Sequence, residues 1–412
     1  MANKGTDTVG QTTSRGLSRG TNQTGVRLYN ERLVLSMIRR AAELPKADIA
    51  RATNLSPQTI SIIINHLTRD GLLLRGDPVR GRIGQPSVPY SLNPKGAYAF
   101  GLKIGRRSTD LYLINFTGEI LQLARETYAY PTPKGVLAFA ERSIARLTAD
   151  LSPDITERIV GLGIAAPYDM WKWPDEIGAP MQDIRAWETV DVSVEVAKLC
   201  PWPIYFSNDI TAACAAELMF GRGSEHDDYL YVYIGTFMGG GLVLDGHLFP
   251  GKSKNSAALG SIPHRDKDGN LHQLMNVASI YVLEKNLAET GKNTDVLWQS
   301  PEDWGDLGEP LEEWMSEVAN SLAVAIMGSI AVIDVDTVIL DGAFPTHVRA
   351  MIVERTREAL KLVPSQGVSP FSVIEGSIGN AARAMGGAAI PLLANFTQDR
   401  EVLFKEKTGN IR

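Results

Sequence analysis

The stretch "YIGTFMGGGLVLDG", from Tyr233 to Gly246, decides how the second half of this 412-residue chain folds. A Gly-Thr pair is followed closely by three consecutive glycines, with apolar residues on both sides. Glycine-rich loops of this kind let backbone amides approach a phosphate group. The segments "YLYVYIGT" and "GLVLDG" indicate paired strands, and Gly239 to Gly241 are expected to form a tight turn beside a cleft.

Strands and helices alternate on both sides of this stretch. The runs "RIVGLGIAAP" and "DTVILDGA" are typical of buried strands, and "VLAFAERSIARLTADL" and the region from about Leu311 to Ile333 of helices. The series is repeated in two halves after Ala97. It predicts an α/β fold with layers of helices against sheets.

The composition limits the classes of protein to consider. A chain of 412 residues is long enough for two or three domains. No uninterrupted apolar run reaches the roughly 20 residues that a membrane span requires, and residues 1–20 lack the apolar core of a signal peptide. The two cysteines, Cys200 and Cys214, are too few for a disulfide framework. We therefore expect a cytoplasmic protein that does not contact a membrane.

Charge is distributed unevenly along the chain. The first 100 residues hold 14 Lys and Arg against 6 Asp and Glu, whereas residues 101–412 hold 27 against 41. A basic head on an acidic body suggests that the head binds a polyanion. Chance segregation of surface charge is the alternative, so the charge alone decides nothing.

The N-terminal 95 residues contain two kinds of sequence. Residues 1–24 are rich in Gly, Thr, Ser, Asn and Gln, and are expected to be a disordered tail. From Val26 the apolar spacing predicts a helix, and "LPKADIARATNLSPQTISIIINHLTRDGLLL" predicts two more helices with a turn at Asn54-Leu55. Residues 25–95 are thus expected to form a separate domain.

The second helix of this pair has the pattern of a DNA-recognition helix. Ser56 is a predicted N-cap, Pro57 takes the first helical position, and isoleucines and Leu67 form an inward stripe. Short polar side chains are left outward, where they can hydrogen-bond base edges in a major groove. The candidate base-reading residues are Ser56, Gln58, Thr59, Ser61 and Asn65.

A β-hairpin is predicted to follow, with strands around Leu72–Arg75 and Val88–Leu92. Its tip, "RGRIGQP", carries Arg80 and Arg82 beside glycines, which suits insertion into a narrow minor groove. The alternative is a small helical protein-interaction module with a solvated basic loop. Helix spacing, cap, hairpin and charge agree on DNA binding, and the stretch from about Asn30 to Leu92 resembles the winged helix-turn-helix of bacterial sugar-responsive repressors.

The body resembles the ROK family of repressors and sugar kinases. The resemblance lies in five stretches in order: "GLKIGRRSTDLYLINFTGEIL", "GLGIAAP", "NDITAACAAE", "YIGTFMGGGLVLDG" and "ARAMGGAA". It implies a two-lobed actin/hexokinase-like (ribonuclease H-like) fold over residues 96–412. Lobe one would comprise about 96–207 plus the C-terminal helix, and lobe two about 208–385.

The resemblance also allows the catalytic and phosphate-binding motifs of family kinases to be compared with this sequence. The base of family kinases is the Asp of an Asn-Asp pair, which matches Asn208-Asp209; a helix N-cap at Asp209 is the alternative. The first phosphate hairpin, Asp-x-Gly-Gly-Thr in the family, is here Lys103 to Arg107. In the second, Phe237 replaces a glycine. We therefore expect no kinase activity, with no binding of ATP or magnesium.

The metal and sugar motifs of the family are altered as well. The zinc-binding cysteines are missing from "LGSIPHRDKDGNLHQLMNVASIY", and His264 and His272 cannot complete a tetrahedral set, so no metal is expected. Ser261 stands where the family has a sugar-binding glutamate. The effector-site residues that the resemblance implies are Asn208, Asp209, Ser261 and His264. Tryptophans in the same half, Trp171, Trp173 and Trp187, are candidates for stacking on a sugar or for the core.

Three functions remain open from the sequence. The first is a transcriptional regulator, expected to repress carbohydrate uptake or catabolism genes, that binds operator DNA as a homodimer or homotetramer and is controlled by a sugar-like effector in the interlobe cleft. The second is an ATP-dependent sugar kinase with an appended DNA-binding head. The third is a regulator whose body is an assembly scaffold without a ligand. The degraded phosphate hairpins favour the first.

Overall fold

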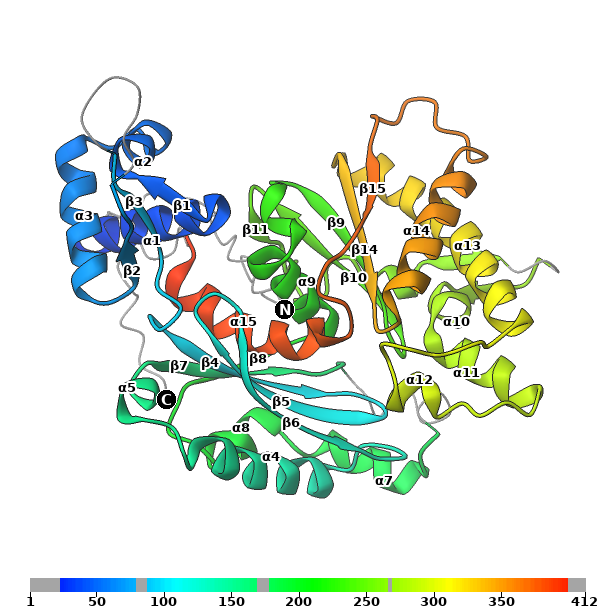
Figure 1. The fold of residues 1–412 in the computed structure, drawn as a ribbon. Helices are drawn as coiled ribbons and strands as arrows, with labels where there is room; N and C mark the ends of the chain where they lie inside the picture. The colour runs from blue at the N-terminus through cyan, green and yellow to red at the C-terminus, as the bar shows by residue number, and fades with distance from the viewer. Residues whose placement is uncertain (1–22, 79–86, 169–177, 266–268, 399–412) are drawn as a thin grey trace, which may run out of the picture.

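The computed structural model describes residues 23–78, 87–168, 178–265 and 269–398. The head, at one end of the molecule in Figure 1, is a winged helix-turn-helix domain. Its elements are α1 (Gln23–Ala41), β1 (Glu43–Pro45), α2 (Lys46–Thr53), α3 (Pro57–Arg69), β2 (Leu73–Arg75) and β3 (Pro89–Leu92). The strand β1 was not predicted; it pairs antiparallel with β3, which also pairs with β2. Helix α1 begins at Gln23, so the predicted disordered tail of 1–24 is wrong for its last two residues, and 1–22 lie outside the described residues.

Lobe one is a five-stranded sheet in the order β6-β5-β4-β7-β8, with helices on its outer face. The three strands β6, β5 and β4 are antiparallel, and β4, β7 and β8 are parallel. The elements are β4 (Tyr98–Ile104), β5 (Ser108–Asn115), β6 (Ile120–Thr127), α4 (Pro133–Thr148), α5 (Pro153–Thr156), β7 (Ile159–Ala165), α7 (Met181–Arg185), α8 (Val192–Ala197) and β8 (Ile204–Ser207).

Lobe two repeats that topology with the sheet order β11-β10-β9-β14-β15. The first three strands are again antiparallel and the last three parallel. Its strands are β9 (Tyr229–Ile234), β10 (Met238–Leu244), β11 (His247–Leu248), β14 (Thr337–Gly342) and β15 (Ser372–Glu375), with a small hairpin of β12 (Pro263–Arg265) and β13 (Leu271–Gln273). Its helices are α10 (Met275–Ala278), α11 (Ile280–Glu289), α12 (Val296–Gln299), α13 (Glu309–Ile333) and α14 (Thr346–Leu360). The duplicated α/β layers confirm the predicted fold class.

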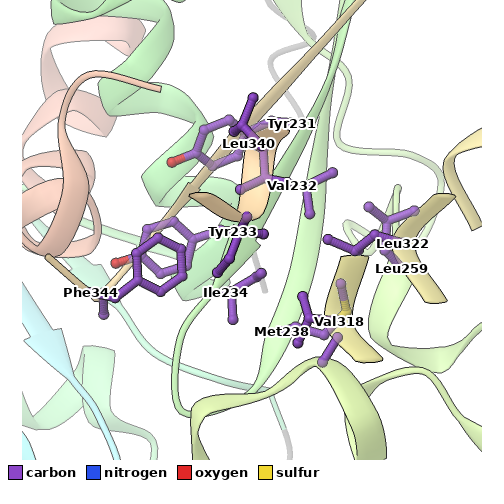
Figure 2. Packing of buried hydrophobic residues seen from close by; sticks show 14 of the residues in the cluster. Tyr231, Val232, Tyr233, Ile234, Met238, Leu259, Val318, Leu322, Leu340 and Phe344 are labelled. Atoms are coloured by element: carbon purple, nitrogen blue, oxygen red, sulfur yellow. The ribbon is translucent and has the colours of Figure 1, made fainter. Parts of the chain in front are cut away.

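The central strand of lobe two is buried on both faces. Every residue of β9 is buried, since helices cover one face and α9 (Asp209–Phe220) covers the other. Figure 2 shows Tyr231, Tyr233 and Leu340 packed in this core. Two-sided burial requires a continuous apolar strand, which is what "YLYVYI" supplies.

Helix α13 is long and apolar enough to cross a membrane, with a mean hydropathy of 1.6 over its most apolar window. Half of that window is buried inside the protein, including Val318, Leu322 and Ile326 of the lobe-two core. The helix also packs along α14. In this structure α13 is therefore a core helix of lobe two.

The three consecutive glycines lie inside a strand, so the predicted tight turn is wrong. Gly239 to Gly241 belong to β10 and pair with Tyr233 to Tyr231 of β9, and the turn falls instead at Gly235 to Phe237. A Cβ at position 241 would lie 2.5 Å from Cys214 Cβ on α9, and one at position 240 would lie 2.7 Å from the carbonyl oxygen of Ala257. The glycines let α9 and a loop lie directly against the two faces of the strand.

The two helices α9 and α15 (Ala382–Phe396) join the sheets to the head. A Cβ at Gly386 of α15 would lie only 1.8 Å from the carbonyl oxygen of Ala212 on α9, and one at Gly163 of β7 only 1.9 Å from that of Gly387. The backbones are thus in direct contact. Both helices also belong to one hydrophobic cluster with the head, whose members include Val34, Ile38, Ile60, Phe116, Met219 and Leu392.

Candidate functional site

A cavity of about 220 Å³ lies between the two lobes. It is lined by the β4–β5 turn, the segment after β7, the N-terminus of α9, the β9–β10 turn, the segment 255–261 and the start of α15. We call it the interlobe cavity. Its lining residues include Arg106, Tyr168, Asn208, Asp209, Thr236, Phe237, Ser261 and Arg383. It is smaller than the roughly 300–1,000 Å³ of pockets that hold drug-sized ligands, and suits a small molecule.

The N-terminus of α9 projects into this cavity. Asn208 is the N-cap, because its Oδ1 accepts hydrogen bonds from the backbone N–H of Ile210 at 3.0 Å and of Thr211 at 3.4 Å. Asp209 is the first helical residue, so the alternative that Asp209 itself caps the helix is wrong. Capping is performed by its neighbour, and the carboxylate of Asp209 is left for another partner.

That partner is Arg383 on α15. Its Nη1 lies 3.4 Å from Asp209 Oδ2, and both side chains are about nine-tenths buried. Burial raises the pKa of Asp209, although Arg383 opposes the shift. The guanidinium also lies over the ring of Tyr233, 5.6 Å from its centroid. One oxygen of the Asp209 carboxylate is thus engaged by Arg383.

Sequence reasoning missed Arg383. The signal was present, because Arg383 is the one charged residue in "ARAMGGAA", a segment of otherwise small and apolar residues. A charge in such a helix must be paired or must face a polar site.

The structure brings together three of the four predicted effector residues. Asn208, Asp209 and Ser261 all line the interlobe cavity. His264 does not line it; this histidine lies in a separate apolar groove beside α13, with its Nε2 3.4 Å from Ser321 Oγ. Ile262 and Pro263, where β12 begins, line the same groove as His264.

The histidines do not form a metal site with other described residues. His264 and His272 oppose each other across the β12–β13 hairpin. Within the described ranges, no group of three or more His, Cys, Asp and Glu side chains is arranged to hold a metal ion. Two imidazoles alone do not supply the four ligands of a structural zinc site.

The β4–β5 hairpin, where family kinases bind phosphate, holds its charges in internal pairs. Lys103 is buried and donates to Asp110 Oδ2 at 2.7 Å and to Ser108 Oγ at 2.6 Å. Burial lowers its pKa to about 8, against the opposing effect of Asp110. Lys103 thus fills the position of the family's acidic residue with a cation that is already paired.

The two arginines of that hairpin bridge the lobes. Arg106 Nη1 lies 2.5 Å from Glu284 Oε2, and Arg107 Nη2 lies 2.5 Å from Glu284 Oε1. Glu284 belongs to α11 of lobe two and also accepts from Trp298 Nε1 at 3.3 Å. We call Arg106, Arg107 and Glu284 the interlobe bridge. It joins the β4–β5 turn of lobe one to α11 of lobe two.

Aromatic side chains complete the walls. Phe237 contacts the hydrophobic cores of both lobes and packs edge-on against Tyr281, with ring centroids 5.5 Å apart. A phosphate-binding hairpin needs a turn whose backbone amides are not covered by a side chain. In this turn the ring of Phe237 occupies that space. Trp187 is a core residue of lobe one, with its Nε1 bonded to the carbonyl oxygen of Pro131 at 3.0 Å, so the stacking role considered for it is wrong. Trp171 and Trp173 lie outside the described residues.

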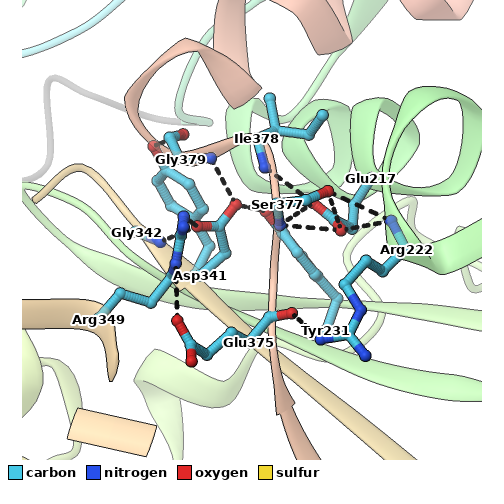
Figure 3. A network of polar contacts seen from close by, with 11 residues as sticks. Glu217, Arg222, Tyr231, Asp341, Gly342, Arg349, Glu375, Ser377, Ile378 and Gly379 are labelled. Carbon is cyan, nitrogen blue, oxygen red and sulfur yellow. Dashed lines mark hydrogen bonds and ion pairs between the residues drawn. The ribbon is translucent and has the colours of Figure 1, made fainter. Parts of the chain in front are cut away.

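A polar network fixes the loop that leads into α15 (Figure 3). Glu217 of α9 accepts hydrogen bonds from the backbone N–H of Arg222, Ser377 and Ile378, at 2.9 to 3.3 Å. Asp341 at the end of β14 accepts from Gly379 N at 2.9 Å. Because these carboxylates hold both the end of α9 and the start of α15, the two helices are fixed relative to each other.

In the head, the helix α3 presents the predicted polar face. Ser56 is the N-cap and accepts from Thr59 N at 3.1 Å, while Ile60, Ile63, Ile64 and Leu67 are buried as predicted. Gln58 and Asn65 are exposed, Thr59 and Ser61 are half-buried, and Asn65 accepts from Lys46 Nζ at 3.3 Å. Arg80 and Arg82 lie outside the described residues.

The head is held against the body through α1. Arg39 Nη1 donates to the carbonyl oxygen of Phe116 at 2.9 Å and lies over the ring of Phe116, which also packs edge-on against Phe396 of α15. Arg40 pairs with Asp227 at 2.7 Å, just beyond the C-terminal end of α9. Both α9 and α15 therefore begin at the interlobe cavity and end at the head.

Comparison with known proteins agrees with this architecture. The chain is 22% identical over 379 residues to the xylose repressor of Bacillus spizizenii, covering 90% of this chain and 96% of the relative. Its fold is similar to that of a ROK family transcriptional regulator homologous to the Escherichia coli MLC protein, with a TM-score of 0.63, 19% identity, and coverage of 90% of this chain and 97% of the other. A ROK family glucokinase from Streptomyces griseus, in complex with glucose and AMPPNP, aligns with a TM-score of 0.54 and 18% identity, over 71% of this chain and 99% of that one.

Two sequence families divide the chain at the boundary between head and body. The MarR family pattern matches residues 29–83, which include α2 and α3. The ROK family pattern matches residues 99–393, more than half of the chain and both lobes. The chain belongs to the ROK family, with a MarR-type winged helix-turn-helix domain ahead of its sugar-kinase-like body.

Proposed function

We propose that this protein is a transcriptional repressor that binds operator DNA through its head and releases it when a sugar-type effector binds in the interlobe cavity. The observation that carries the proposal is that the same two helices contact both the interlobe cavity and the DNA-binding head. The helices α9 and α15 line the cavity with Asp209 and Arg383 and share a hydrophobic cluster with the head. The similar xylose repressor supports carbohydrate uptake or catabolism genes as the targets.

The effector acts by favouring one relative position of the lobes. Its contacts come from lobe one at Arg106, from lobe two at Thr236 and Ser261, and from the two connecting helices. A ligand shifts a conformational equilibrium only by its difference in affinity for the two states. Movement of the lobes around α9 and α15 reorients the head because their distal ends are packed against α1.

Loss of kinase activity is part of this proposal. Three features support it: Asp209 is paired with Arg383, Lys103 is committed to Asp110, and Phe237 fills the second hairpin. The second candidate function, a sugar kinase with a DNA-binding head, is favoured only by the likeness of the body to ROK kinases. No nucleotide, magnesium or zinc is required for the function that we propose.

The remaining parts of the proposal concern assembly and location. Two-fold related heads that read paired half-sites are the simplest arrangement for operator binding, so we propose a homodimer or homotetramer. The base-reading residues would be Ser56, Gln58, Thr59, Ser61 and Asn65, with Arg80 and Arg82 reading the minor groove. The site of action is the cytoplasm.

Operator release tests the proposal. DNA that the purified protein selects from genomic fragments is labelled and titrated in the presence of neutral sugars, sugar acids and sugar phosphates. At least one compound is expected to release the DNA. ATP turnover is measured with the same sugars, and robust turnover would establish the kinase alternative instead.

A further inference from the structure

One large apolar side chain lies on the exposed face of the helix α3, at the outer edge of the head (Figure 1). Ile62 is 63% exposed, whereas the other large apolar residues of this helix are at most 4% exposed: Ile60, Ile63, Ile64 and Leu67. The base-reading residues predicted from the sequence are all polar, and Ile62 is not among them. Its exposure therefore needs an explanation that the buried stripe does not supply.

Ile62 lies at the centre of the face that is opposite to the buried stripe. Gln58 is four residues before it and Asn65 three residues after it, so these side chains share one face of the helix. Both are exposed. Arg69 continues the row seven residues after Ile62, with its side chain 71% exposed. Ile62 thus interrupts a row of side chains that is otherwise polar.

The stability of the head does not account for an isoleucine at this position. The rest of the head and the body leave most of its side chain uncovered. Isoleucine also has a lower helix propensity than Arg, Lys, Gln or Glu, so it is a poor choice for an exposed helical position. Single exposed apolar side chains are common on protein surfaces. The evidence for a role is therefore the place of Ile62 in the row, together with its exposure.

The ends of the row carry positive charge. Lys46 of α2 donates to Asn65 Oδ1 at 3.3 Å, and Arg69 lies in the last turn of α3. Arg69 Nε is 3.5 Å from Asp70 Oδ1, and both side chains are largely exposed. Such an exposed pair is weak, and the other guanidinium donors can bind a phosphate. A polar face with basic ends and an apolar centre suits the major groove of duplex DNA better than it suits an apolar partner.

The major groove offers one apolar substituent to such a face. Base edges there carry hydrogen-bond donors and acceptors, and thymine adds a C5-methyl group. An isoleucine that packs against a donor or acceptor instead leaves that group without water or a partner, which is costly. We infer that Ile62 contacts the C5-methyl group of a thymine in each operator half-site and thereby selects a T·A pair at that position. The inference rests on the proposed function, because it requires α3 to enter the major groove of operator DNA.

The spacing along α3 limits where this thymine lies. Gln58 and Asn65 are seven residues apart, which is about 10 Å along the helix axis at roughly 1.5 Å per residue. In B-DNA this distance corresponds to about three base-pair steps of roughly 3.4 Å. The thymine is therefore expected within a few base pairs of the pair whose recognition changes in Gln58→Ala.

Replacement of thymine by uracil tests the contact, because it removes the methyl group and keeps the hydrogen-bonding groups of the base. Operator duplexes are synthesised from the DNA that the full-length protein selects, with each thymine replaced by uracil in turn. Affinity is measured by fluorescence anisotropy. We expect uracil at one position of a half-site to weaken binding by roughly 4-fold, which is about 0.8 kcal/mol for one buried methyl-sized group.

Variants assign the effect to Ile62. Ile62→Ala is expected to bind the thymine and uracil duplexes equally at that position, and Ile62→Val to keep part of the difference. Val194→Ala changes a valine of α8 that is 53% exposed, and should leave the difference at its full size. Since the side chain of Ile62 lies outside the buried stripe, melting temperatures should not change, and thermal melting checks this.

The outcomes separate the inference from the proposed function. If the protein binds its operator and releases it with an effector, but no uracil replacement weakens binding in a way that depends on Ile62, the inference is wrong and the proposed function stands. If Ile62→Ala weakens binding equally on thymine and uracil duplexes, Ile62 acts elsewhere, for example against a second copy of the head, and the inference is again wrong. If the protein selects no DNA, both are rejected.

Discussion

Arg383 of α15 lies 3.4 Å from Asp209 of α9, and the two residues are 174 positions apart in the sequence. The pair joins the two helices at the cavity end. At their far ends, Arg39 of the head lies over the rings of Phe220 and Phe116, and Phe396 packs against Phe116. Removing one member leaves the other charge buried. We therefore expect substitution of either residue to affect both the stability of the body and the binding of an effector.

Asp209→Asn is expected to abolish effector-dependent release of operator DNA while operator affinity is kept. It is also expected to lower stability by about 3–5 kcal/mol, because Arg383 is left as an uncompensated buried charge. The measurements are DNA binding by fluorescence anisotropy with and without effector, and denaturant unfolding. Asp154→Asn, which changes an exposed aspartate on α5, is the matched control. Normal release by Asp209→Asn would contradict the assignment of the cavity.

Gln58→Ala is expected to weaken operator binding by about 1–3 kcal/mol, because a side chain that reads a base edge is lost. Gln58 is exposed on α3 and its removal leaves the buried stripe intact, so melting temperature should not change. Gln182→Ala, an exposed glutamine on α7, is the matched control. Equal operator affinities for the two variants would exclude Gln58 from the contact.

Gly386→Ala is expected to disrupt the contact between α15 and α9. A Cβ there would lie 1.8 Å from a backbone oxygen, which rigid helices cannot accommodate, so a loss of several kcal/mol of stability is expected, at or above the upper end of about 1–3 kcal/mol for overpacking. Gly328→Ala in α13 is the control, because its Cβ would meet nothing within 4 Å. That change should raise stability by about 0.5–1 kcal/mol through helix propensity. Urea unfolding measures both, and similar stabilities would contradict the packing described.

Glu284→Gln is expected to open the interlobe bridge. Arg106 and Arg107 lose their shared carboxylate, and about 3 kcal/mol of stability should be lost because the pairs are largely buried. The radius of gyration from small-angle X-ray scattering should increase in the absence of effector. Glu289→Gln, at the exposed end of the same helix, is the control. An unchanged radius and melting temperature would show that the bridge does not hold the lobes together.

Arg39→Met is expected to uncouple the two sites. The contact between the head and Phe116 is lost, while the cavity and α3 remain intact. The effector should then change operator affinity much less than the roughly 5- to 150-fold typical of allosteric coupling. Arg51→Met, an exposed arginine within the head, is the control. Operator affinity is measured at zero and saturating effector, and a wild-type ratio would locate the coupling elsewhere.

The head could be predicted almost entirely from its sequence. The isoleucine stripe of α3, the cap at Ser56 and the two hairpin strands lie close to their predicted positions, because each depends on residues a few positions apart. The strand β1 was missed because three residues have no detectable period. For Gly239 to Gly241 the local pattern suggested a turn, but the glycines serve the close approach of α9 to β10, which no local pattern reveals.

By itself, the sequence determined the winged helix-turn-helix and the duplicated α/β lobes, and it predicted the absence of kinase activity. These properties follow from local periodicity and from the residue types within short motifs. Only the tertiary structure decided that Asp209 pairs with Arg383, that Glu284 joins the lobes through two arginines, and that His264 lines a groove other than the interlobe cavity. Those relationships bring together residues from distant segments, and chain topology and close packing, rather than any short-range preference, set which of them meet.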